Sequence, residues 1–96
     1  MDNHDHHAAD LCRAIAEEMR QVGALVEELA NVLVADDDIA LRHLDRLQAF
    51  DLVIQRTGES AQLLDRLAAG AHSHEAVEGV RLECVQQRLR DAMKAA

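Results

Sequence analysis

The segment from residue 44 to residue 68 carries apolar side chains at alternating spacings of three and four. This spacing keeps side chains on one face of an α-helix and is incompatible with a β-strand. The seam consists of Leu47, Phe50, Ile54, Thr57, Ala61, Leu64 and Ala68. It keeps its phase through Gly58, which favours one continuous helix with a close backbone contact or a kink at this glycine. A break at residues 57–60 stays open, because Gly58 is able to end one helix and Ser60 to cap another.

A second seam precedes the first and follows the same alternation without interruption. Its members are Cys12, Ile15, Met19, Val22, Val26, Leu29 and Leu33, and the stripe is widened by Leu11, Leu25 and Val32. The pattern predicts a helix over residues 8–35 that buries one whole side. Residues 1–7 are expected to fray.

Three consecutive aspartates, at positions 36–38, interrupt the pattern between the two seams. They predict a turn with an N-cap, because an Asp there accepts hydrogen bonds from the free N–H groups of the next helix. A cation site is disfavoured, since the spacing of an EF-hand loop is missing. The following helix is expected over residues 38–69, with His43 in phase at the edge of its seam. So short a connection makes the first two helices antiparallel neighbours.

A third helix is expected over residues 73–95, after Gly70 and with Ser73 as its N-cap. The chain contains no proline, four glycines and a single aromatic residue, a composition that favours helix over strand. We therefore predict one all-α domain spanning residues 1–96, a long antiparallel helical hairpin with a third helix completing a three-helix bundle. Because 96 residues bury only a modest core, we expect a homodimer formed through the helical seams.

The charge balance limits the partners of this chain. Eighteen acidic and ten basic side chains give a formal net charge of −8, which repels a nucleic acid backbone. The sequence has no apolar run long enough for a membrane span and no signal peptide pattern, so the cytoplasm is the expected compartment. Cys12 and Cys84 are expected as reduced, small core residues rather than reactive thiols.

Five histidines form the first candidate site. An up-down-up order of helices brings the start of the first helix to the same end as the turn before the third. Neutral imidazoles there could bind zinc or nickel. The alternative is an exposed cluster that binds metal only adventitiously, and no cofactor is otherwise required. The residues are His4, His6, His7, His72 and His74.

Asp51 and Gln55 form the second candidate site. They belong to a polar row beside the 44–68 seam, together with Gln48 and Gln62. Asp51 and Gln55 are one helical turn apart, so a carboxylate and an amide can reach the same point in solvent and orient a water molecule. The alternative is a solvated polar strip or a helix–helix hydrogen bond. With ten Asp and six Gln residues, such a pair is expected by chance about 0.6 times.

The stretch LQAFDLVIQ, residues 47–55, resembles the catalytic helix of the CheZ family of chemotaxis phosphatases. That family dimerises through long helical hairpins and presents an Asp and a Gln four apart to a phosphorylated receiver domain. The resemblance implies that Gln55 positions the attacking water, that Asp51 engages a lysine of the partner, and that Mg²⁺ belongs to the partner. The chain departs from the family pattern at Phe50, which replaces a Gln, and at the bulky Val53 and Ile54. It also has no counterpart of the family's carboxyl-terminal tail.

The sequence therefore supports three hypotheses of function. The first is a non-enzymatic helical interaction module, an adaptor or regulator in bacterial signalling. The second is a CheZ-like phosphatase of receiver domains that uses Asp51 and Gln55. The third is metal binding at the histidine-rich end.

Overall fold

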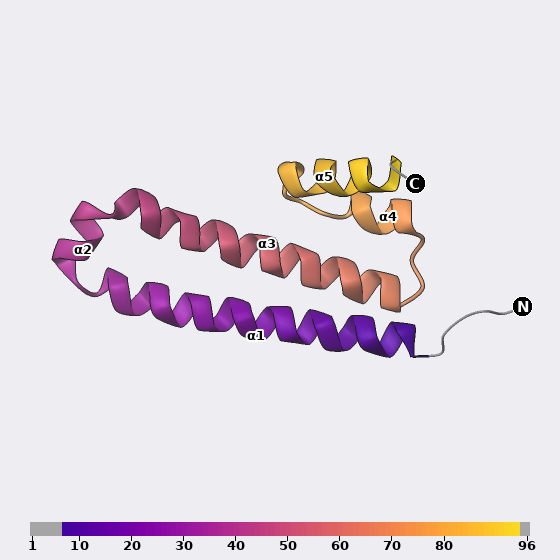
Figure 1. The fold of residues 1–96 in the computed structure, drawn as a ribbon, viewed down its shortest axis with the longest axis horizontal. Helices are drawn as coiled ribbons and strands as arrows, with labels where there is room; N and C mark the ends of the chain where they lie inside the picture. Colours follow the sequence, from indigo (N-terminus) through magenta and orange to yellow (C-terminus); the bar gives the residue numbers. More distant parts are fainter. Residues whose placement is uncertain (1–6, 95–96) are drawn as a thin grey trace, which may run out of the picture.

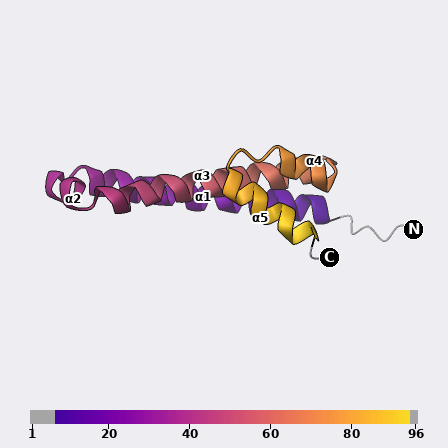
Figure 2. The same ribbon diagram turned by 90° about the horizontal axis from the view of Figure 1, so that it is seen from above.

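The structure is a computed structural model that describes residues 7–94, and within this range it contains five helices and no strand. The helices are α1 (Ala8–Val34), α2 (Asp37–Arg42), α3 (Leu44–Ala68), α4 (Ser73–Glu78) and α5 (Glu83–Lys94). The prediction of an all-α fold is confirmed. The two long helices, α1 and α3, lie side by side and antiparallel, with α2 closing one end of the hairpin (Figures 1 and 2).

The turn at the closed end of the hairpin agrees with the prediction from the aspartates. Asp36 is the N-cap of α2, and its carboxylate accepts the backbone N–H groups of Asp38 at 3.0 Å and Ile39 at 3.2 Å. The expected helix over residues 38–69 is nevertheless divided in two. His43 leaves the helical conformation, with φ −126° and ψ 29°, and separates α2 from α3. This break lets the short α2 fold across the end of the hairpin rather than extend α3.

Helix α1 approaches α3 closely at Gly23. A Cβ added to this glycine would lie 3.1 Å from the Thr57 Oγ1 atom. Ala16 and Gly23 are the buried residues of α1, and small side chains at this spacing allow two helix backbones to approach. On α3 the predicted seam is confirmed, since Leu47 and Ala61 are buried and its other members are at least half-buried.

Gly58 does not play the role expected of it. Helix α3 runs through this residue unbroken, as predicted. A Cβ added at Gly58 would meet nothing within 4 Å, so the close contact expected here is absent; the close approach is found instead between Gly23 and the Thr57 side chain. Helix α3 ends where expected, because Gly70 has a positive φ of 103°, a conformation that suits glycine.

The prediction that α1 buries one whole side is wrong for the single chain. Helix α3 packs against Ala16 and Gly23 and partly covers Cys12, Met19, Val26 and Leu33, whereas other large side chains of the predicted stripe remain in solvent. Val22 is 43% exposed, Leu25 is 65% exposed and Leu29 is 51% exposed. We call the exposed set the α1 apolar face, and it comprises Leu11, Ile15, Val22, Leu25, Leu29 and Val32.

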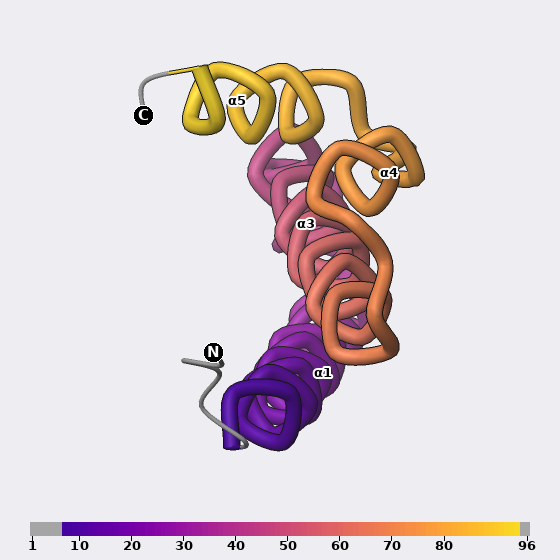
Figure 3. Tube along the Cα trace, turned by 90° about the vertical axis from the view of Figure 1, so that its right-hand side faces the viewer, coloured from indigo at the N-terminus to yellow at the C-terminus, as the bar shows by residue number. Residues whose placement is uncertain are grey.

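The third helix expected over residues 73–95 is also divided. Residues 79–82 separate α4 from α5, and α5 turns back toward the end of the hairpin at which α1 begins (Figure 1). Seen along the hairpin, α4 and α5 lie beyond α3 from α1 (Figure 3). Helix α4 begins at Ser73 itself, so His72 rather than Ser73 occupies the N-cap position. The backbone N–H of His72 donates to the Glu75 carboxylate at 3.4 Å.

The largest apolar cluster lies between α3, α4 and α5, away from α1. Its buried members are Leu63, Ala76, Val77, Val80 and Val85. The pair α4 and α5 therefore covers the carboxyl-terminal part of α3 on the side opposite α1 and leaves the closed end of the hairpin uncovered (Figure 1).

Candidate functional site

Asp51 and Gln55 lie on α3, one turn apart, and both are exposed to solvent. Gln48 and Gln62, the other members of the polar row, are exposed as well. Within residues 7–94, Asp51 makes no hydrogen bond or ion pair. The carboxylate and the amide are therefore available together to a molecule that approaches this side of α3, and neither makes, in the described part of the chain, the helix–helix hydrogen bond that was the alternative. Their catalytic role stays a prediction.

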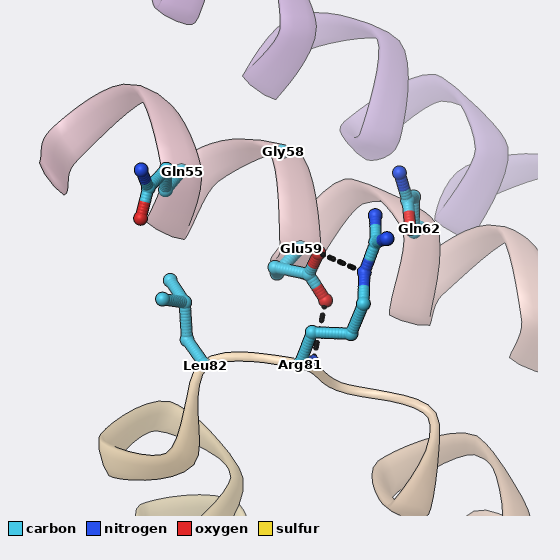
Figure 4. A pocket seen from close by; sticks show the side chains of 6 residues that line it. All are labelled: Gln55, Gly58, Glu59, Gln62, Arg81 and Leu82. Atoms are coloured by element: carbon cyan, nitrogen blue, oxygen red, sulfur yellow. Dashed lines mark hydrogen bonds and ion pairs between the residues drawn. The ribbon is translucent and has the colours of Figure 1, made fainter. Parts of the chain in front are cut away.

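An open pocket of about 330 Å³ lies beside Gln55 (Figure 4). Helix α3 contributes two amides to its wall, and the segment between α4 and α5 closes the other side. Figure 4 shows Leu82 opposite Gln55, and the guanidinium of Arg81 directed toward Gln62. The lining residues are Gln55, Gly58, Glu59, Gln62, Arg81 and Leu82.

Glu59 holds the far wall of this pocket in place. Its carboxylate accepts the backbone N–H of Arg81 at 2.8 Å and the Arg81 Nε–H at 3.3 Å. Glu59 is only 8% exposed, whereas the Arg81 side chain is 78% exposed. A buried carboxylate needs such donors, because an unpaired charge there is costly. Sequence reasoning missed this pair, since the two residues are 22 positions apart and only the turn before α5 brings them together.

Hydrogen bonds from arginine side chains connect α4 to α3 and α5 to α4. The Arg66 guanidinium donates to the Ala76 carbonyl oxygen from Nη2 at 2.8 Å and from Nε at 3.2 Å. Arg90 on α5 donates to both carboxylate oxygens of Glu78, at 2.7 and 2.9 Å. These hydrogen bonds lower the pKa of Glu78 and raise the pKa of Arg90. The wall of the pocket is thus fixed by several polar contacts in addition to the apolar cluster.

Helices α1 and α3 share one ion pair across the hairpin. Arg20 of α1 donates to the Asp65 carboxylate at 2.9 Å, and this hydrogen bond raises the pKa of Arg20. Both side chains are more than two-fifths exposed, so the pair adds little to stability.

The histidines are divided between described and undescribed parts of the chain. His7 at the start of α1 and His72 and His74 before and within α4 lie at the same end of the hairpin (Figure 1). His4 and His6 lie outside the described residues. Residues 7–94 contain no group of three or more His, Cys, Asp or Glu side chains placed to hold a metal ion. The five-histidine zinc or nickel site stays a prediction.

The position of one of the two cysteines differs from the expected core position. Cys12 is half-buried, but Cys84 is exposed near the start of α5, so the expected core position of Cys84 is wrong. The Arg56 guanidinium donates to the Cys84 sulfur at 3.8 Å. Both cysteines are free.

In the described part of the chain, no helix combines the length and the apolar character that crossing a membrane requires.

A second exposed feature is the α1 apolar face, which sequence reasoning assigned to the interior. Its six side chains are between 43% and 69% exposed. From Leu11 to Val32 they extend over about 32 Å of helix at 1.5 Å per residue. Large exposed apolar patches on soluble proteins mark interaction surfaces.

No family model matches this chain, and neither a curated protein nor a solved structure matches it.

Proposed function

We propose that this protein is a helical interaction module, an adaptor or regulator in bacterial signalling, that binds a protein partner through the α1 apolar face. The observation that carries the proposal is the exposure of six large apolar side chains along one side of a 27-residue helix. Keeping such a surface in water forgoes the free energy that its burial would release. The homodimer expected from the sequence would use the same face.

The bacterial signalling context is supported by the resemblance of residues 47–55 to the CheZ helix. Glu18 is the one charged side chain within the α1 apolar face, and it is exposed. A surface made mainly of Leu, Ile and Val side chains binds other apolar surfaces and has no group for acid–base or nucleophilic chemistry. A binding role therefore fits this face better than catalysis does.

Site-specific photocrosslinking in the native cells tests the proposal. A benzophenone amino acid replaces Leu25 on the α1 apolar face, and the matched control replaces Asn31, which is exposed on the polar side of α1. We expect a discrete adduct from position 25 and none from position 31. The captured protein, once purified, should bind the wild-type chain at least about tenfold more tightly than the Leu29→Glu variant. The absence of an adduct at position 25 would contradict the interaction role.

A second candidate function is a phosphatase of phosphorylated receiver domains. The joint exposure of Asp51 and Gln55 favours it, because water positioning requires both groups to face solvent. In this function Gln55 orients the attacking water, Asp51 contacts a lysine of the receiver domain, and the partner holds the Mg²⁺. A homodimer would carry two such pairs.

Dephosphorylation of purified receiver domains, phosphorylated with acetyl phosphate, tests the second candidate. We expect the wild-type chain to accelerate phosphate release and the Gln55→Ala variant to lose about 10²-fold of that acceleration. Gln48→Ala is the matched control, since Gln48 is an exposed amide on the same side of α3, and it should keep the acceleration. Failure of the wild-type chain to accelerate any receiver domain of its own organism would reject this function.

A further inference from the structure

We infer that the occupant of the α1 apolar face is a second copy of this chain, so that two hairpins stack into a four-helix bundle. The inference rests on the proposed interaction role of this face and names its partner. Three features of the structure carry it: the incomplete interior, the surplus of surface, and the way in which the face continues from α1 onto α3.

The interior of the single chain is incomplete. Within residues 7–94, no large side chain is fully buried. Between α1 and α3 the buried positions are Ala16, Gly23, Leu47 and Ala61, of which only Leu47 has a large side chain. The large side chains of the α1 apolar face lie outside this contact, and a domain needs at least two packed layers to bury such side chains.

The chain exposes more surface than a compact protein of its mass. Its accessible surface is 6997 Å², whereas a compact monomer of 10.6 kDa exposes about 5,500 Å². The difference, taken over all 96 residues including those outside 7–94, is about 1,500 Å². A standard stable interface removes about 800 Å² from each partner. The surplus is therefore large enough for one interface of the size that holds two copies together.

The apolar face continues from α1 onto α3. In an antiparallel pair of right-handed helices, helical phase places Val53 and Leu64 on the side of α3 that adjoins the α1 apolar face. Val53 is 42% exposed and Leu64 is half-buried. Two adjoining helices present a layer rather than a groove for a single peptide. A second two-helix layer, related by a two-fold axis, is the surface of matching shape.

This dimer leaves the candidate catalytic row free. Asp51 and Gln55 lie about 180° around α3 from Val53 and Leu64 at 3.6 residues per turn. The second copy therefore covers one side of the hairpin while the polar row stays in solvent on the other.

Glu18 is the one charged side chain within the α1 apolar face, and it provides a sensitive test. It lies between Ile15 and Val22 along the face and is exposed in the single chain. In the dimer its carboxylate would lie in an apolar interface, where it weakens association. The Glu18→Leu variant should therefore form a tighter dimer.

Sedimentation equilibrium of the purified full chain, from about 1 to 100 µM, measures the association. We expect a wild-type dimer, a Leu29→Glu variant whose association is weaker by at least about tenfold, and a Glu18→Leu variant whose association is tighter. Asn31→Glu adds the same charge two positions away on the polar side of α1 and should leave the association unchanged. If Leu29→Glu fails to fold, tighter association of Glu18→Leu supports the second copy and unchanged association overturns it.

The remaining outcomes separate this inference from the proposed function. A wild-type chain that stays monomeric at 100 µM, while position 25 crosslinks to a different protein, overturns the second copy and leaves the interaction role intact. A dimer unaffected by both Leu29→Glu and Glu18→Leu also overturns it, because the contact then lies elsewhere. A monomer with no crosslink from position 25 rejects both.

Discussion

The buried carboxylate of Glu59 on α3 accepts the backbone N–H of Arg81 at 2.8 Å, and this bond fixes the turn between α4 and α5 against the pocket beside Gln55. The contact joins two parts of the chain that are 22 residues apart and sets the shape of one wall of that pocket. Its removal should therefore be visible both in stability and in the position of α5.

Replacing Glu59 by Ala should lower the free energy of unfolding by about 2 kcal/mol, because the Arg81 N–H loses a charged acceptor. Glu59→Gln should lose less, since the amide oxygen still accepts that N–H. Urea unfolding measures both variants, and amide hydrogen exchange at residues 81–85 should rise in Glu59→Ala. Glu83→Gln, an exposed carboxylate without this role, is the control. Equal stability of Glu59→Ala and the wild type would show that the bond does not hold the turn.

Gly23→Ala should destabilise the hairpin although alanine favours helix formation. The new Cβ would lie 3.1 Å from the Thr57 Oγ1, and this hydroxyl is held by hydrogen bonds to the Val53 and Ile54 carbonyl oxygens. Gly58→Ala, with nothing within 4 Å of the new Cβ, should instead stabilise α3 by up to about 1 kcal/mol.

A double-mutant cycle tests the cause of the Gly23 effect. Thr57→Ala removes the atom that crowds the new Cβ, so it should rescue Gly23→Ala. Thermal unfolding of the two single variants and the double variant gives the coupling. Additive effects would mean that Gly23→Ala acts through something other than Thr57.

The ion pair between Glu78 and Arg90 should make stability depend on acid pH. Its hydrogen bonds lower the pKa of Glu78 below the ordinary value of 4.5, so its contribution is present above that value and is lost as the pH falls through the lowered one. Glu78→Gln should therefore have a lower Tm than the wild type at pH 7. The difference should vanish at more acidic pH, as calorimetry across the range would show. A Tm difference that stays constant with pH would assign the effect to packing.

Salt should strengthen the proposed dimer. Each chain carries a formal net charge of −8, so two copies repel each other at long range. Raising NaCl from about 20 to 500 mM screens this repulsion while leaving apolar contacts intact. We expect the dissociation constant from sedimentation to fall over that range. A dissociation constant that rises with salt would indicate an interface held by ion pairs instead.

Several local features were predictable because neighbouring residues decide them. The alternating spacing of three and four predicted the helices, the aspartates at 36–38 predicted a capped turn, and Gly70 marked the end of α3. Helical phase predicted the polar row beside the α3 seam, but the structure decided that Asp51 and Gln55 face solvent rather than a neighbouring helix.

The sequence by itself determined the helical character of the chain and the side of α3 that faces its neighbour, because both depend on side-chain periodicity within a few turns. It also determined the turns at Asp36 and Gly70, because a capping carboxylate and a glycine with positive φ act locally. The tertiary structure decided which side of α1 is covered, because both the small-residue stripe at Ala16 and Gly23 and the adjoining large-residue face are apolar. It also decided the breaks at His43 and at residues 79–82, and the burial of Glu59 against Arg81. The covered side of α1 and the Glu59–Arg81 pair arise from contacts between residues distant in the chain, which side-chain periodicity does not record.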